Sequence, residues 1–266
     1  MPYYNTNQTA IFYTDTGRGR PILFIHGLGA SSAMFEPQVA AFRTGYRVLC
    51  PDLRGSGQSG RLTGPIATIL DRQCDDIADL LDYLELKQVV LCGVSYGGVV
   101  TYHFALRHPD KVRAIIITDS AGDTDPTSLK ERLIWISLCT AFWLIALPAR
   151  LLQPIIRAQY RRWPLACAQM LRIVGHLRKK EAVLQHFAIL RTNHTRQLAR
   201  IHCPALGIVG NTLAISLKLM QRAMQKIARS ELYVITNAVD PTNLCQPANF
   251  NRLVQQFLHK INWTSR

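Results

Sequence analysis

The segment from Gly93 to Gly97 holds a serine in a pattern suited to nucleophilic chemistry. It reads Gly-Val-Ser-Tyr-Gly and lies between the apolar run 89–92 and a helical pattern that ends at Arg107. In such a strand–turn–helix context, small flanking residues allow the strained turn that exposes the serine hydroxyl. Ser95 is therefore a candidate nucleophile, and acyl transfer is the chemistry it could perform.

The elements that would position this serine alternate between strand and helix patterns. Apolar runs typical of buried strands occur at 21–25, 47–50, 89–92, 114–117, 205–209 and 231–235, and helical patterns at 71–86, 96–107 and 250–261. This alternation predicts an α/β fold with a mostly parallel central sheet and helices on both faces. Only helical patterns occur from about 129 to 200. We therefore predict a core formed by 1–128 and 201–266 and an inserted helical cap over 129–200, above the carboxyl edge of the sheet.

Three segments in this order resemble one known family. They read His26-Gly27-Leu28-Gly29-Ala30-Ser31, Pro51-Asp52-Leu53-Arg54-Gly55-Ser56-Gly57-Gln58-Ser59 and Gly93-Val94-Ser95-Tyr96-Gly97-Gly98. The chain resembles the α/β-hydrolase family, in particular its small esterase and enol-lactonase-like members, over nearly its whole length outside the predicted cap. The resemblance implies that Ser95 is the acylated nucleophile and that His26 is a structural turn residue.

Two backbone amides could stabilise the negative charge that develops on a carbonyl oxygen in acyl transfer. The Tyr96 amide lies at the start of the helix after Ser95, where the helix dipole favours an anion. In this fold the second donor comes from the loop after an earlier strand, and the turn 26–29 offers the Leu28 amide. We therefore predict an oxyanion hole and substrate contact formed by Gly27, Leu28 and Tyr96.

The chain departs from the family pattern at the positions of the usual acid and histidine. After the run 205–209 the sequence reads Gly210-Asn211-Thr212-Leu213, which puts leucine at the acid position. After the last strand, Asp240 occupies the place of the histidine. An aspartate with an unperturbed pKa of about 3.9 is a poor base for a serine hydroxyl at neutral pH. Hydrolysis by an ordinary triad is therefore not expected.

Three interpretations of the altered site remain open. In the first, Asp119 at the end of the run 114–117 is a relocated acid, and a cap histidine supplies the base: His176, His186 or His194. In the second, the pocket is kept for ligand binding, or for a non-hydrolytic reaction that uses the oxyanion hole with Asp240 as carboxylate base. In the third, the protein is a degenerate scaffold without small-molecule chemistry.

The leading prediction is a hydrolase of carboxylic esters or thioesters that carry an apolar acyl group. Its catalytic residues would be Ser95, Asp240 and Asp119, with the triad incomplete. The alternative is a catalytically impaired ligand-binding or regulatory pseudoenzyme.

The predicted cap combines an uncharged stretch with a concentration of basic residues. Residues 133–149 carry no charged side chain. A membrane span there is rejected, because Pro148 interrupts the stretch and a span would separate strands of one sheet. We expect a lid over a small apolar substrate, lined by Trp135 and Trp143. Residues 130–200 contain 13 Lys and Arg against two Glu, so this segment holds +11 of the net charge of +14. This basic face is a candidate for peripheral contact with an anionic membrane, whereas no nucleic-acid-binding motif is present.

The remaining bulk features indicate a reduced, folded protein. The 266 residues suit one α/β domain with an insertion, and 48% hydrophobic with 18% charged residues excludes a disordered chain. The seven cysteines are odd in number and scattered, which favours free thiols. No secretory signal precedes the first apolar run, so a cytoplasmic location is expected. No metal or cofactor is predicted, since no ligand set has metal-binding spacing.

Overall fold

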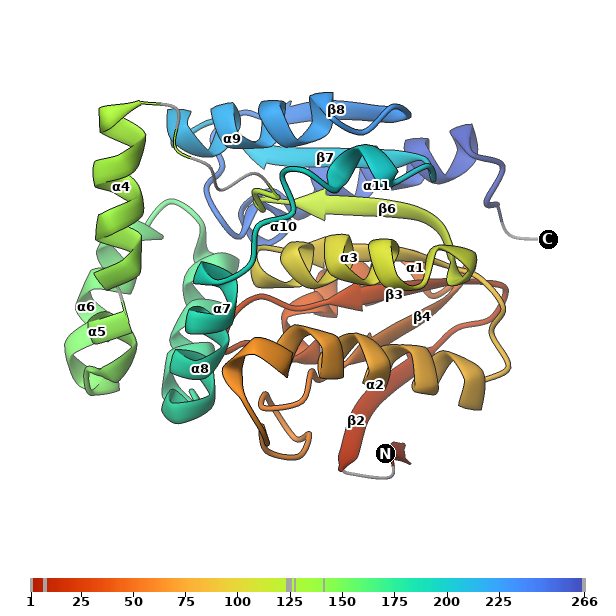
Figure 1. Ribbon diagram of the computed structural model, residues 1–266, viewed down its shortest axis with the longest axis horizontal. Coiled ribbons are helices and arrows are strands. Elements are labelled where there is room, and N and C mark those ends of the chain that lie inside the picture. The colour runs from red at the N-terminus through yellow and green to blue at the C-terminus, as the bar shows by residue number, and fades with distance from the viewer. Residues whose placement is uncertain (1, 7–8, 123–125, 127, 141, 265–266) are drawn as a thin grey trace.

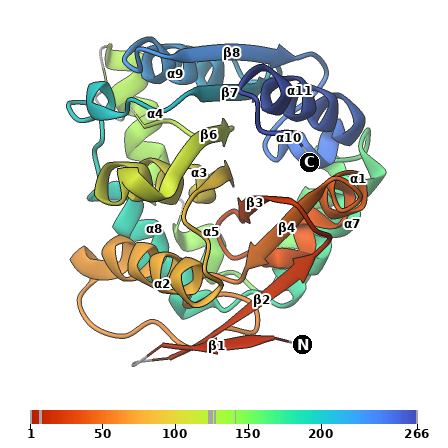
Figure 2. The same ribbon diagram turned by 90° about the vertical axis from the view of Figure 1, so that its right-hand side faces the viewer.

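A single eight-stranded sheet forms the centre of the computed structural model, which describes residues 2–6, 9–122, 126, 128–140 and 142–264. The strand order is β1-β2-β4-β3-β5-β6-β7-β8 (Figures 1 and 2). The strands are β1 (Tyr3–Asn5), β2 (Ala10–Thr16), β3 (Arg20–Ile25), β4 (Tyr46–Pro51), β5 (Val89–Val94), β6 (Val112–Thr118), β7 (Ala205–Gly210) and β8 (Ser230–Ile235). The pairs from β4 to β8 are parallel, while β1 and β2 add antiparallel pairs at one edge. The predicted mostly parallel α/β sheet is confirmed.

Helices cover both faces of this sheet (Figure 2). The core helices are α1 (Glu36–Phe42), α2 (Ile69–Tyr83), α3 (Tyr96–Arg107), α9 (Ala214–Gln225), α10 (Thr242–Cys245) and α11 (Pro247–Lys260). Short 3-10 turns are η1 (Ser32–Phe35), η2 (Ile66–Thr68), η3 (Pro109–Lys111) and η4 (Leu198–Arg200). In β3, Phe24 packs into the core on the α1 and α11 side, and its neighbour Ile25 packs on the α2, α3 and α9 side. Because both faces are buried, the parallel strands are continuously apolar, as the sequence pattern required.

The edge of the sheet and several helices were not anticipated from sequence. Strands β1 and β2 and helices α1, α9 and α10 have no counterpart among the predicted elements. Strand β2 ends in polar residues that suit an edge, where Asp15 forms an ion pair with Arg47 at 2.7 Å. An antiparallel edge strand is stabilised by pairing with a distant segment, here β4, and local apolar patterning does not reveal such pairing.

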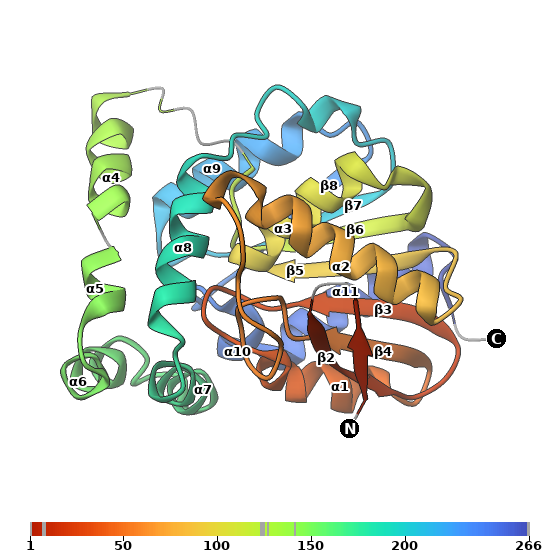
Figure 3. The ribbon, with the colours of Figure 1, turned by 60° about the horizontal axis from the view of Figure 1, so that its bottom comes forward.

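Five helices described between β6 and β7 lie beyond the carboxyl ends of the parallel strands (Figures 1 and 3). They are α4 (Leu129–Thr140), α5 (Phe142–Ala146), α6 (Ala149–Gln159), α7 (Pro164–Gly175) and α8 (Lys179–Leu190). The uncharged stretch 133–149 is thus divided between two helices and the start of a third. None of the described helices combines the length and the apolar character needed to cross a membrane.

The turn between β5 and α3 is as tight as the glycine pattern predicted. Ser95 has φ 54° and ψ −117°, a strained conformation for a residue with a side chain. A methyl group on Gly97 would lie 2.0 Å from the carbonyl oxygen of Ile25. One on Gly93 would lie 2.2 Å from the carbonyl oxygen of Gly97. Glycine is therefore required at both flanks because backbone atoms of β3 and α3 fill the space.

We predict that Gly97→Ala destabilises the protein by about 3 kcal/mol, because the added methyl meets backbone that cannot rotate away. Thermal unfolding followed by circular dichroism measures the effect. Gly175→Ala at the end of α7 is the matched control, since a methyl there has no atom within 4 Å. The control should be neutral or gain up to about 1 kcal/mol. Equal melting temperatures for the two variants would contradict the packing argument.

Candidate active site

The structure brings Ser95 and Asp240 into direct contact, although 145 residues separate them. The Ser95 hydroxyl donates a hydrogen bond to Asp240 Oδ2 at 2.8 Å. The Ser95 amide donates to the carbonyl oxygen of Thr118 at 2.8 Å, and its own carbonyl accepts from the Gly98 amide at 2.9 Å. The turn is therefore fixed by backbone bonds, while the hydroxyl is directed at the carboxylate.

Asp119 lies directly after β6 and organises the loop that carries Asp240. Its carboxylate accepts hydrogen bonds from the Thr242 amide at 2.7 Å, the Thr242 hydroxyl at 2.9 Å and the Gly210 amide at 3.2 Å. Thr242 is two residues beyond Asp240, so these bonds tie the end of β6 to the loop after β8. Asp119 thus acts as a positioning residue for Asp240.

Two aromatic side chains fix the same loop from the opposite side. The Tyr160 hydroxyl, just after α6, donates to the carbonyl oxygen of Asp240 at 2.6 Å. The Trp163 indole, just before α7, donates to the carbonyl oxygen of Asn237 at 3.0 Å. Both aromatic side chains are buried. The helices between β6 and β7 therefore support the backbone of the candidate site.

The two carboxylates have unusual protonation behaviour. Burial and, to a smaller extent, the charge of Asp119 raise the pKa of Asp240 to about 8, against the hydrogen bond from Ser95. Burial also raises the pKa of Asp119, against the hydrogen bonds from Thr242 and Gly210. Because more donors stabilise its anion, Asp119 keeps the negative charge and Asp240 holds the proton near neutral pH. The expectation that Asp240 has an ordinary carboxyl pKa is therefore wrong.

The residues predicted to form an oxyanion hole lie beside Ser95. A methyl group on Gly27 would be 3.6 Å from the Ser95 Cβ atom, so the turn 26–29 packs against the serine. Apart from bonds inside helices and strands, no backbone hydrogen bond in the described chain starts at the amide of Leu28 or Tyr96. The Tyr96 hydroxyl is buried and donates to Gln73 Oε1 at 2.6 Å. Only the backbone of Tyr96 could therefore serve the site.

His26 has the structural role that the resemblance implied. Its Nε2 accepts a hydrogen bond from the Leu53 amide at 3.0 Å, and its Nδ1 lies 2.8 Å from the carbonyl oxygen of Gly27. The first bond makes Nε2 the unprotonated nitrogen, so Nδ1 is the donor. The ring is fully buried, and this burial lowers its pKa.

The cap histidines with described hydrogen bonds are engaged away from Ser95. His194 Nε2 lies 3.1 Å from Nδ1 of His103, whose Nε2 lies 2.8 Å from Asp71 Oδ1. Burial lowers the pKa of His194 to about 4. His176 Nδ1 lies 3.0 Å from the carbonyl oxygen of Arg172, and His186 is buried on α8. The hydrogen bond described for the Ser95 hydroxyl involves Asp240, which favours the interpretations built on that aspartate.

The tryptophans predicted to line the substrate pocket belong to the outer helices. Trp135 is on α4, but its side chain is outside the described residues. Trp143 is on α5 and is 66% exposed, so its ring reaches solvent. Leu213, at the family's acid position, is also exposed and precedes α9. The aromatic residues found at the site instead are Tyr160 and Trp163, which the sequence analysis did not single out.

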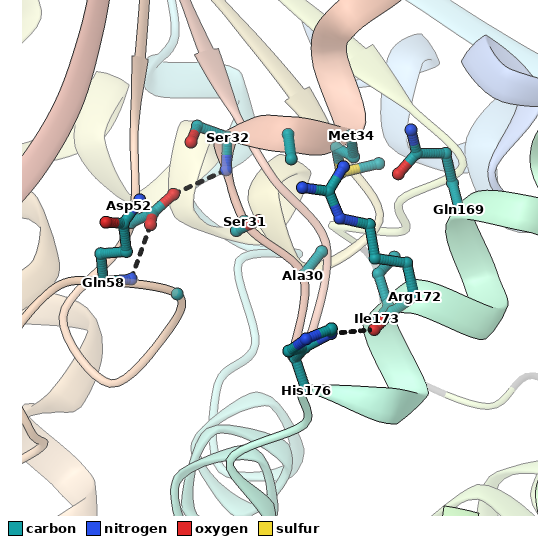
Figure 4. A pocket seen from close by; sticks show the side chains of 13 residues that line it. Ala30, Ser31, Ser32, Met34, Asp52, Gln58, Gln169, Arg172, Ile173 and His176 are labelled. Atoms are coloured by element: carbon teal, nitrogen blue, oxygen red, sulfur yellow. Dashed lines mark hydrogen bonds between the residues drawn. The ribbon is translucent and has the colours of Figure 1, made fainter. Parts of the chain in front are cut away.

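A cavity of about 310 Å³ lies beside the segment Gly29–Met34 (Figure 4). It is lined by Gly29, Ala30, Ser31, Ser32, Ala33, Met34, Asp52, Gly57, Gln58, Gln169, Arg172, Ile173 and His176. Asp52 accepts hydrogen bonds from the amides of Ser32 at 2.6 Å and Gln58 at 2.8 Å. Its carboxylate therefore holds two loops together. Neither Ser95 nor Asp240 lines this cavity.

No metal-binding arrangement appears among the described residues, where no group of three or more His, Cys, Asp or Glu side chains is suitably placed. The described cysteines are all unpaired: Cys50, Cys74, Cys92, Cys167, Cys203 and Cys245. Burial raises the pKa values of Cys74 and Cys92, so these thiols are not activated.

Comparison with known proteins agrees with the fold. Residues 20–138 match the family model described as alpha/beta hydrolase fold. The chain is 26% identical to 3-oxoadipate enol-lactonase 2 of Acinetobacter baylyi, over 98% of this chain and 100% of that protein. A thermophilic esterase from Thermogutta terrifontis superimposes with TM-score 0.81 at 25% identity, over 95% of this chain and 94% of the other. The enol-lactonase from Burkholderia xenovorans gives TM-score 0.83 at 24% identity, over 97% and 100%.

The parallel sheet, the strained serine turn and these matches define an α/β-hydrolase fold. The chain therefore has the α/β-hydrolase fold, and over nearly its whole length it is similar to enol-lactonases. Its relatives include hydrolases of several kinds, among them esterases and enol-lactonases.

The raised pKa of Asp240 predicts a pH-dependent cost to stability. An aspartate in the unfolded chain titrates near 4, whereas Asp240 in the folded chain titrates near 8. The folded state binds the extra proton between these values, so this contribution to stability falls as pH rises from about 4 to about 8. Asp240→Asn removes the titration and keeps an acceptor for Ser95. We expect its advantage in melting temperature over the wild type to grow between pH 5 and pH 9. Parallel melting curves across this range would refute the assignment.

Proposed function

We propose that the protein is a serine hydrolase of carboxylic esters or thioesters with an apolar acyl group, in which Asp240 replaces the usual histidine base. The observation that carries this proposal is the 2.8 Å hydrogen bond from the Ser95 hydroxyl to an aspartate whose pKa is raised to about 8. A carboxylate with this pKa is a far stronger base than an ordinary aspartate. It falls in the range where general bases work best near neutral pH.

Acylation begins when the ionised Asp240 accepts the hydroxyl proton while Ser95 Oγ forms a bond to the substrate carbonyl carbon. The carbonyl oxygen becomes an oxyanion beside the amides of Leu28 and Tyr96, which stabilise it. Collapse of this intermediate breaks the bond to the alcohol or thiol. The leaving group takes the proton from Asp240, so Asp240 is again ionised and Ser95 is acylated.

Deacylation repeats the same steps with water as the nucleophile. Asp240 accepts a proton from water, the hydroxide oxygen bonds to the acyl carbon, and the oxyanion again forms beside the two amides. Collapse expels the Ser95 oxygen, which recovers its proton from Asp240. The products are a carboxylic acid and the free enzyme. Asp119 remains anionic throughout, and its charge keeps Asp240 basic.

The apolar acyl group is supported by the side chains around the Asp240 loop. Tyr160 and Trp163 pack into the same apolar core cluster as Val239, together with residues of α6 and α7. In our proposal helices α4–α8 act as a lid on this side of the sheet. Esterase and enol-lactonase relatives also act on carbonyl–oxygen bonds, which is the reaction type proposed here. A cytoplasmic location, predicted from the sequence, accords with the unpaired cysteines.

A second candidate function is ligand binding without turnover, and the same pKa favours it. With a pKa of about 8, only about one Asp240 in ten is ionised at pH 7. The protonated carboxyl is a hydrogen-bond donor as well as an acceptor, which suits recognition of a ligand carbonyl. Such a pseudoenzyme would gain thermal stability from apolar esters or acids and would not consume them.

We predict that hydrolysis of p-nitrophenyl esters increases with pH up to and beyond about 8, because Asp240 must be ionised to act. Ser95→Ala should abolish the activity, and Asp240→Asn should reduce it about 100-fold, within the range of lost general-base catalysis. Steady-state rates from pH 5 to pH 10 provide the measurement. Labelling of Ser95 by a fluorophosphonate should follow the same pH dependence.

Asp240→His is the decisive companion variant. A histidine there would be supported by the anionic Asp119 and would be ionisable near pH 7. We expect it to raise the rate at pH 7 at least tenfold and to shift the onset of activity to lower pH. An unchanged rate of ester hydrolysis in the Asp240→Asn variant would mean that another group is the base. The second candidate function would be established by two results together. The wild-type protein would bind esters without turnover, and only the Asp240→His variant would hydrolyse them.

A further inference from the structure

Helix α4 exposes large apolar side chains along one face. Leu129 is 73% exposed, Leu133 is 59% exposed and Ile136 is 52% exposed. Their spacing of four and three residues places them on the same side of the helix. A soluble helix normally buries such a stripe, so this face of α4 is unusual for a surface in contact with water.

The apolar surface continues onto the next two helices. Trp143 and Leu144 on α5 are both exposed, as are Leu151 and Ile155 on α6, which are again four residues apart. The opposite side of α6 is buried at Ile156 and at the adjoining Tyr160. Helix α6 therefore has one face in the protein and another that presents aliphatic side chains to solvent.

These three helices form the outermost layer at one end of the molecule. Figures 1 and 3 show α4, α5 and α6 in a column, with α7 and α8 between this column and the sheet. The column is joined to the core through polar contacts of α4 and through packing of α6. Glu131 on α4 binds Lys218 at 2.7 Å and Arg222 at 2.9 Å, both on α9. We call this column, residues 129–140 and 142–159, the outer layer.

Arginines accompany the exposed apolar residues. Five are exposed in or next to the outer layer: Arg132, Arg150, Arg157, Arg161 and Arg162. Across the described chain, no salt bridge joins any of these five to a carboxylate. The acids of the segment, Glu131 and Glu181, are buried and already paired with basic side chains. The outer layer is therefore apolar and positively charged, without compensating negative charge.

We infer that the outer layer docks on an anionic lipid surface. Aliphatic side chains and a tryptophan would enter the headgroup and acyl boundary, while the arginines contact lipid phosphates and acidic headgroups. A second copy of the same face is a poorer partner, because it would oppose five arginines with five arginines. This inference is independent of the proposed hydrolysis, although Tyr160 at the end of α6 also contacts the Asp240 loop.

Co-sedimentation of the full chain with vesicles tests this inference. Vesicles of phosphatidylcholine with 30% phosphatidylserine are compared with pure phosphatidylcholine, at low salt and at 0.5 M salt. We expect the protein to bind the anionic vesicles at low salt. Its binding to neutral vesicles, or to anionic vesicles at high salt, should be at least tenfold weaker. Trp143 fluorescence should shift to the blue on binding.

Two sets of variants separate the apolar and charged contributions. Leu144→Glu with Ile155→Glu, and separately Arg157→Glu with Arg161→Glu, should each weaken vesicle binding at least tenfold. The control matched to the Leu144 and Ile155 pair is Tyr233→Glu with Val234→Glu, which adds the same two negative charges at two exposed apolar residues on β8. This control and Ser95→Ala should bind like the wild type. All these side chains except Ser95 are exposed, and circular dichroism verifies folding.

Three outcomes would overturn the inference. One is no binding to anionic vesicles at low salt. Another is binding that the β8 control weakens as much as the outer-layer variants. The third is a dimer in light scattering that the outer-layer variants dissociate, which would assign the face to a second copy of the chain. Loss of esterase activity with intact vesicle binding would reject only the proposed hydrolysis.

Discussion

Two partly buried carboxyl groups, those of Asp119 and Asp240, determine the electrostatics of the candidate site. Asp119 and Asp240 cannot both ionise there without a cost in free energy, because their charges repel each other and both residues are partly buried. The hydrogen bonds to Asp119 decide which of them stays ionised. Asp240 is left as the group that gains and loses a proton, and it is the one in contact with Ser95. In the proposed mechanism, these surroundings allow an aspartate to take the role of the usual histidine base.

The sheet makes this arrangement possible because it brings the ends of distant strands to one edge. Ser95 follows β5, Asp119 follows β6, and the loop with Asp240 follows β8. Parallel strands in adjacent positions place their carboxyl ends side by side, so residues far apart in the chain meet there. The backbone fixes Ser95, and hydrogen bonds to side chains fix the Asp240 loop. The catalytic geometry therefore depends on both strand order and loop anchoring.

Helices α4–α8 serve the site with one surface and face away from it with another. Tyr160 and Trp163 hold the Asp240 loop, which explains why both aromatic residues are buried. The outer surface of α4–α6 remains apolar and basic, a combination that a globular protein does not need for stability. The basic charge concentrated in this segment is thus a property of one surface of the molecule.

The sequence by itself determined the fold, the serine turn and the residues at the positions of the lost acid and histidine. These follow from local rules: continuous apolar strands, glycines where backbone atoms meet, and motifs in a fixed order. It also located Asp119 and Asp240, the two acids that meet near Ser95. Sequence did not reveal the antiparallel strand β2 or the contacts of Tyr160 and Trp163, because each depends on a partner far away in the chain. Only the tertiary structure decided the protonation of Asp240. A pKa depends on burial and on neighbouring charge, and neither of these follows from the residue type alone.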